Sequence, residues 1–137
     1  MALECTLIHE TGLPVPMTVA DGTGIEKGAV LKLTDPNTAA TATGDTDACA
    51  GIAAREKIAS DGNTKLAVYK EGIFKGFAGA AGVTVGRAIQ TDTGTGAANE
   101  LVVCDANAEG IIGTALETAT DTQSFKFLLC PINPVLA

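Results

Sequence analysis

The sequence predicts an all-β protein, a small β-barrel or a compact β-sandwich, built from two pseudo-repeated halves with an extended N-terminal arm. Three observations lead to this prediction. Short apolar segments alternate with turns rich in Gly, Asp and Thr, which leaves no room for the helices of βαβ crossovers. A glycine-marked pattern occurs twice. The length of 137 residues fits one domain with one core.

Residues 1–20 are expected to form the arm. Pro14 and Pro16 remove backbone donors and fix φ near about −65°, which favours an extended segment over a helix. Two interpretations stay open: a first edge strand of the domain, or a segment that reaches onto a neighbouring molecule. In either case its anchoring side chains are Leu3, Leu7, Ile8, Leu13, Pro14, Val15 and Met17.

The repeat is visible as the pattern G-[IV]-x-x-G-x-[AV]-[LI], which occurs at residues 24–31 and again at 82–89. A second pair of matching segments begins at Gly51 and at Gly113. The copies are 58 residues apart in the first pair and 62 in the second, so the loop between them differs in length. Each half is too short to bury a face alone. We therefore expect halves at about 24–77 and 82–131 to pack together within one β domain, residues 21–137.

Residues 51–77 are predicted to form a long β-hairpin with arms at 52–59 and 64–77. The link between the arms carries Asp61, Gly62 and Asn63, which tolerate the positive φ of a tight turn. Residues 53–59 also contain good helix formers. We favour strand there because the turn follows at once and because the second copy is rich in β-branched Thr.

The composition indicates a thin core and an acidic surface. The hydrophobic fraction of 46% rests heavily on Ala, with no Trp, one Tyr and four Phe, so burial stabilises this chain less than a Leu-rich one. A net charge of −7 repels a phosphate backbone, so direct nucleic-acid binding is not expected. No apolar run reaches the roughly 20 residues of a membrane span, and no leader pattern is present, so we expect a soluble cytosolic product without membrane contact.

The cysteines are widely scattered, at Cys5, Cys49, Cys104 and Cys130, with no C-x-x-C pair. The chain has a single histidine, so neither a zinc site nor a redox motif has its usual spacing. We expect four buried thiols that pack as small hydrophobic side chains.

No catalytic constellation is found. The glycines at 22, 24 and 28 lack the Gly-Lys-[Ser/Thr] ending of a phosphate-binding loop. His9 is the only histidine, and the only serines, Ser60 and Ser124, lie in predicted turns without a Gly-flanked nucleophile elbow. Asp45 and Asp47 lack calcium-loop spacing. We therefore predict no catalytic, cofactor or metal residues and no enzyme activity.

Several motifs together carry a family resemblance. They are G-I-E-K-G-x-x-L-K-L at 24–33, A-G-I-A-x-x-x-K-x-x-x-D-G at 50–62, V-Y-K-E-G at 68–72, I-I-G-T-A-L-E at 111–117 and F-K-F-L-L-C-P at 125–131. With the arm, they resemble the capsid cement or decoration proteins of tailed bacteriophages, over about residues 15–131. The resemblance implies a non-enzymatic β-barrel or β-sandwich protein without cofactors, made in the bacterial host cytoplasm and located on the outer capsid surface of the virion.

The resemblance also implies partners. It implies a homotrimer on the capsid that clamps neighbouring major capsid proteins against internal DNA pressure, with the N-terminal arm as the capsid-contacting segment. Such an arm could add a strand to a capsid sheet edge. An alternative from another class is a small-molecule or carbohydrate-binding β module with its pocket in loops 35–48 and 91–100. These loops carry no aromatic platform for stacking against a sugar.

Overall fold

The structure is a computed structural model that describes residues 4–43, 48–92, 99–104 and 110–132. These residues form eleven strands and no helix, which confirms the all-β prediction. In particular, the described part of the chain has no helix long and apolar enough to cross a membrane. The strands are β1 (Thr6–His9), β2 (Val15–Thr18), β3 (Val30–Asp35), β4 (Thr38–Thr41), β5 (Cys49–Ala53), β6 (Lys65–Tyr69), β7 (Gly72–Ala78), β8 (Ala88–Thr91), β9 (Glu100–Val103), β10 (Ile111–Ala115) and β11 (Ser124–Ile132).

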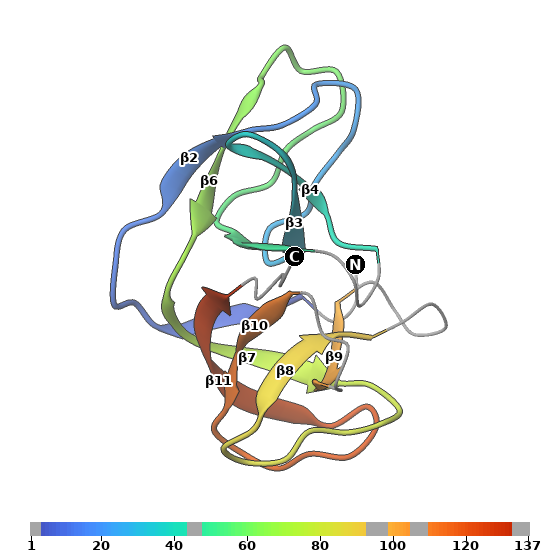
Figure 1. Ribbon diagram of the computed structural model, residues 1–137. Coiled ribbons are helices and arrows are strands. Elements are labelled where there is room, and N and C mark those ends of the chain that lie inside the picture. Colours follow the sequence, from blue (N-terminus) through green and yellow to red (C-terminus); the bar gives the residue numbers. More distant parts are fainter. Residues whose placement is uncertain (1–3, 44–47, 93–98, 105–109, 133–137) are drawn as a thin grey trace.

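The strands form two five-stranded barrels, one above the other in Figure 1. The first barrel is closed in the order β2-β4-β3-β5-β6. In the second, the order β7-β11-β10-β8-β9 is closed by a parallel pairing of β7 with β9. The first barrel has the same kind of parallel closure, between β2 and β4. Strand β1 is added outside the second barrel, antiparallel to β7.

The two barrels share their connectivity strand for strand, with β2 to β6 matching β7 to β11. The isolated bridge Ile25↔Lys57 in the first barrel corresponds to Val83↔Ala119 in the second. These residues are 58 and 62 positions apart, as in the sequence repeat. The repeat seen in the sequence therefore marks equivalent turns of two similar barrels.

The predicted hairpin at residues 51–77 is wrong in both arms. In the first arm, predicted over 52–59, strand β5 ends at Ala53, and bends and turns follow with only an isolated bridge at Lys57. The second arm, predicted over 64–77, is divided between two strands that belong to different barrels. Strand β6 ends at Tyr69 after pairing with β5, and β7 begins at Gly72 as a wall of the other barrel. Gly72 adopts φ +135°, a conformation that favours glycine and lets the chain leave one barrel for the next. The alternation of apolar residues runs through both strands, so it gave no sign of the change of barrel.

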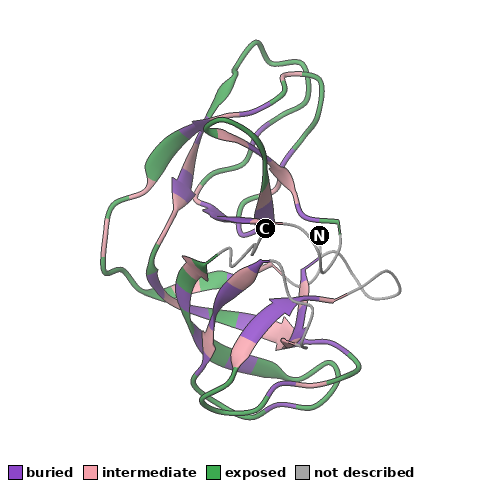
Figure 2. Cartoon of the chain, in the orientation of Figure 1, coloured by how far each residue is buried: buried purple, intermediate pink, exposed green. Residues whose placement is uncertain are grey.

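Each barrel has its own interior, and Figure 2 shows buried residues, in purple, along the strands of both barrels. The first is lined by small and aliphatic side chains: Met17, Val19, Ile25, Ala29, Leu31, Ala39, Ala50, Ala53, Leu66 and Val68. The second interior contains three phenylalanines. The rings of Phe74 and Phe127 are stacked with centroids 6.1 Å apart, and those of Phe125 and Phe127 are 5.7 Å apart.

The junction between the barrels is also buried. Val30, Cys49 and Ile52 come from strands of the first barrel but belong to the apolar cluster of the second. The barrels therefore pack on each other mainly through apolar side chains. One hydrogen bond crosses the same region, in which the Val30 N–H donates to Asn99 Oδ1 at 3.1 Å.

Candidate interaction surface

Strand β1 presents an open edge. It pairs with β7 on one side through Thr6↔Lys75 and Leu7↔Phe74, with a bulge before His9. On its other side it pairs with no other described strand. An unpaired edge of this kind can accept a strand from another chain. Leu7 packs half-buried against the second core, whereas Ile8 is 48% exposed.

The segment after β1 carries further predicted arm residues. Leu13 is 81% exposed and Val15 is 42% exposed, while Pro14 is half-buried. Met17 is only 2% exposed, in the interior of the first barrel, so its side chain cannot reach a partner while the barrel is folded. Leu3 lies outside the described residues. Because β2 is a strand of the first barrel, an arm that ends at residue 20 includes part of the barrel wall.

A shallow groove of about 640 Å³ runs beside this segment. Its lining is mixed in charge: Glu10, Pro14, Lys27, Ala54, Arg55, Glu56, Ala67 and Tyr69. The Tyr69 hydroxyl donates to Glu10 Oε2 at 3.2 Å and ties the segment to the first barrel. Burial and this carboxylate raise the pKa of Tyr69, so the hydroxyl stays protonated as a donor.

The outer face of β7 and β11 holds two lysines that sequence reasoning missed as a pair. Lys75 lies directly opposite Lys126, and the next outward pair along the strands is Ile73 with Leu128. The lysine intervals of five along residues 65–75 showed no stripe within one strand. Only the register of two strands far apart in sequence brings Lys75 and Lys126 together. The alternation of polar and apolar residues at 124–127 indicated that Lys126 faces outward, but it did not indicate which residue lies opposite.

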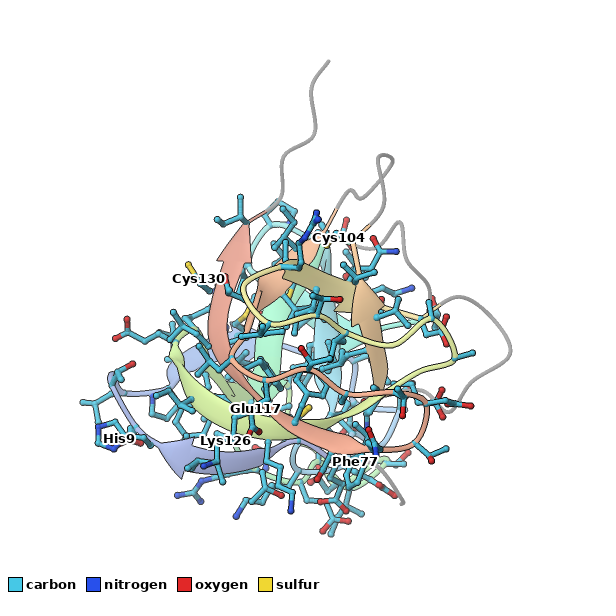
Figure 3. All side chains as sticks on the ribbon, turned by 90° about the horizontal axis from the view of Figure 1, so that it is seen from below. His9, Phe77, Cys104, Glu117, Lys126 and Cys130 are labelled. Atoms are coloured by element: carbon cyan, nitrogen blue, oxygen red, sulfur yellow. The ribbon has the colours of Figure 1, made fainter. Side chains whose placement is uncertain are left out.

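The residues considered for catalysis lie apart. His9 pairs with Ile73 and Ser124 with Phe77, so the two are separated by about 13 Å along β7. Figure 3 shows His9 and Phe77 on opposite sides of the view. Ser60 lies in a turn of the first barrel, where its N–H donates to the Asp21 carbonyl. No group of three potential metal ligands occurs among the described residues, and Asp45 and Asp47 lie outside them.

The thiols differ in exposure. Cys5 and Cys49 are buried as expected, but Cys104 is half-buried and Cys130 is exposed, so the expectation of four buried thiols is wrong for these two. Burial raises the pKa of Cys5 and of Cys49 to about 12, and each thiol is therefore neutral at pH 7. Cys130 lies on the outward-facing side of β11, where the alternation of the strand places it.

The loops of the alternative binding module are only partly described. Residues 44–47 and 93–98 lie outside the described ranges. The alternative, a small-molecule or carbohydrate pocket between loops 35–48 and 91–100, therefore stays a prediction.

By its fold, the chain is an all-β protein of two paired five-stranded barrels with one added edge strand. No protein-family model matches the sequence, and no curated protein matches it. Among solved structures, the fold is similar to the N base of the head fiber gp8.5 in bacteriophage phi29, with a TM-score of 0.54 and 15% sequence identity. The match covers 84% of this chain and 91% of that chain. At this identity the likeness shows a shared fold.

Proposed function

We propose that this chain is a non-enzymatic structural protein of a phage head, and more specifically a cement or decoration protein. It binds the outer surface of the capsid in the virion and stabilises contacts between major capsid proteins. The observation that carries the proposal is the fold, which is similar over nearly the whole chain to the base of a phage head fiber. The cement role rests on the motifs at residues 24–33, 50–62 and 111–131.

The surface of the protein supports a binding role. Strand β1 offers free backbone groups, and the exposed side chains of Ile8, Leu13 and Val15 follow one another along the same segment. A partner that covers them removes apolar surface from water, worth roughly 25 cal/mol per Å². The net charge of −7 suits a position outside the capsid, away from packaged DNA.

The test uses expanded heads that lack this protein. Purified protein is added, binding is measured by co-sedimentation, and the disruption temperature of the heads is measured by calorimetry. We expect saturating protein to raise the disruption temperature, because a ligand of the intact head stabilises it by mass action. Heads that gain nothing at saturation would refute the proposal.

A point variant tests the role of the N-terminal segment. Leu13→Ser removes an apolar side chain that is 81% exposed and should weaken binding by on the order of tenfold. The matched control is Ile58→Ser, which replaces another exposed apolar residue (63% exposed) between β5 and β6 of the first barrel and should bind as the wild type does. If the two variants bind heads with equal affinity, Leu13 is not part of the contact.

The partners proposed are the major capsid protein and two further copies of this chain, arranged as a homotrimer on the capsid. Sedimentation equilibrium of the purified protein measures its mass in solution. A trimer would support this arrangement.

A further inference from the structure

The two barrels contain equivalent glycine turns, one at residues 26–29 (the Gly28 turn) and one at residues 84–87 (the Gly86 turn). The two glycines have φ values of +86° and +82°. The Gly28 N–H donates to the Ala53 carbonyl at 2.9 Å, and the Gly86 N–H donates to the Ala115 carbonyl at 2.8 Å. The turns therefore match in backbone conformation and in hydrogen bonding.

The Gly28 turn is covered by the N-terminal segment of the chain. The Cys5 N–H donates to the Gly28 carbonyl at 3.0 Å. A Cβ atom placed on Gly28 would lie 2.6 Å from the Cys5 carbonyl oxygen and 3.0 Å from Glu4 Cβ. An extended segment thus lies directly on this turn, and any side chain at position 28 would displace it.

The Gly86 turn has no such cover. A Cβ atom on Gly86 would meet nothing within 4 Å, and no group in the described ranges donates to the Gly86 carbonyl. The side chains beside it are apolar: Val85 is 57% exposed and Leu116 is 42% exposed. The first barrel has Lys27 and Ala54 at these two positions. The more apolar of the two turns is therefore the uncovered one, and a partner that covers it would remove apolar surface from water.

A positive charge adjoins this apolar pair. The Leu116 N–H donates to the Lys126 carbonyl at 2.9 Å, so the two residues are neighbours on the outer face. Lys126 in turn lies opposite Lys75. Glu117 also lies near Lys126 (Figure 3), but its Oε1 accepts from the Lys126 backbone N–H at 2.8 Å.

Neither Lys75 nor Lys126 forms an ion pair with a carboxylate of the described residues. Like charges directly opposite each other on a sheet are destabilising. An anion that lies between them would remove this repulsion.

We propose that the Gly86 turn, with Val85, Leu116 and Lys126, is a docking site for an extended segment of the major capsid protein. One backbone N–H of that segment donates to the Gly86 carbonyl, as Cys5 does at Gly28. An apolar side chain packs on Val85 and Leu116, and a carboxylate faces Lys126 and Lys75. The inference rests on the proposed function and adds the site and the chemistry of the partner segment. Residues 4 and 5 already occupy the Gly28 turn, so the N-terminal segment of this chain or of a second copy is not available to cover the Gly86 turn in the same way.

Gly86→Asn tests the proposal, with Gly62→Asn as the matched control. Gly62 has φ +85° and also has open space around it, but it lies in the hairpin turn of the first barrel. Asn tolerates this backbone conformation better than other non-glycine residues, so both variants should fold and melt alike. We expect Gly86→Asn to bind heads at least about tenfold more weakly than Gly62→Asn, because its side chain occupies the place of the docked segment.

A second pair of variants covers the case in which Gly86→Asn does not fold. Lys126→Glu reverses the exposed charge at the site, and Lys65→Glu reverses an exposed charge on the first barrel. We expect only Lys126→Glu to weaken binding to heads, and more so at low salt than at high salt.

The outcomes separate this inference from the proposed function. If wild-type protein binds heads and both variants at the site bind equally well, the inference is overturned and the proposed function stands. If wild-type protein does not bind heads, both fall. If Gly86→Asn changes the sedimentation coefficient of the free protein, the turn is an interface between copies of this chain, and the capsid segment is the wrong occupant.

Discussion

The two barrels have the same connectivity and different interiors. Among the residues that the structure describes, four alanines line the first interior, at positions 29, 39, 50 and 53, and no aromatic ring enters it. The second interior is filled by Phe74, Phe125 and Phe127, each at most 1% exposed. One fold therefore accommodates two very different side-chain volumes.

The features that the barrels do share lie in the backbone. Gly51 and Gly113 occupy equivalent positions, and a Cβ atom on either would collide with a carbonyl oxygen of the next strand, that of Tyr69 or that of Leu128. Ser60 and Thr122 both adopt positive φ, +61° and +67°, in equivalent turns. The comparison indicates that close strand approach at glycines and turn geometry fix the connectivity, whereas core side chains set how much stability each barrel contributes.

The largest expected effect comes from emptying the second interior. Phe127→Ala should lower the free energy of unfolding by about 3–5 kcal/mol, because it removes a fully buried ring and leaves a cavity between Phe74 and Phe125. Urea denaturation followed by circular dichroism measures the change. We expect a single transition, since Val30 and Ile52 of the first barrel pack in the same cluster as Phe127.

Two results would contradict this view. A loss below about 1 kcal/mol would mean that the phenylalanine cluster is not the main source of stability. Two separate transitions would mean that the first barrel survives without the second. The control is Ile58→Ala, at an exposed position of the first barrel, which should change stability by no more than about 0.5 kcal/mol.

Much of the fold could be predicted from sequence because its markers are local. The glycines at 24, 28, 82 and 86 lie at equivalent positions of the two halves, and they revealed the repeat. Which strands share a barrel could not be predicted, because β6 and β7 are separated by only two residues and both alternate in burial. A change of barrel at Gly72 leaves no mark on such an alternation.

The candidate surface was predicted less well than the fold. Ile8 and Leu13 were among the predicted arm residues because they lie in an apolar, proline-containing segment of the sequence, and both side chains are exposed. Val85 and Leu116 were missed, since single apolar residues in turns look like core residues until their exposure is known. The pair Lys75 and Lys126 depends on strand register over 51 residues, which no local pattern reports.

A buried lysine distinguishes the tip of the first barrel from that of the second. Lys57 is 3% exposed, and its Nζ bonds Asp61 Oδ1 at 2.7 Å and Asp21 Oδ1 at 3.1 Å. The equivalent residue of the second barrel is Ala119. Burial alone would lower the pKa of Lys57, but the hydrogen bonds to the two aspartates outweigh it and the pKa is raised. The hydrogen bond from Lys57 holds the pKa of Asp61 below its ordinary value, with help from the Asn63 N–H.

Because the folded-state pKa of Asp61 is lowered, its contribution to stability is present above the ordinary carboxyl pKa of about 3.9 and is lost as the pH falls through the lower folded value. Asp61→Asn should therefore lower the melting temperature at pH 7. It should also make the melting temperature decrease less steeply as the pH is lowered from about 4 to about 2. The control, Asp121→Asn in the turn of the second barrel, should keep the wild-type pH dependence. If the melting temperature of Asp61→Asn falls in acid as steeply as that of the wild type, the ion pair is not the cause of this fall.

The smallest expected effect is chemical and concerns the junction of the barrels. Cys5 and Cys49 are buried there, with pKa values raised to about 12, while Cys130 is exposed on the second barrel. Since the thiolate is the reactive form, iodoacetamide at pH 8 should modify Cys130 in the folded protein and should modify Cys5 and Cys49 only in denaturant. Mass spectrometry of peptides from both conditions measures this directly. Modification of Cys49 at the rate of Cys130 in native protein would show that the barrels separate in solution, and the shared cluster that predicts a single unfolding transition would then be transient.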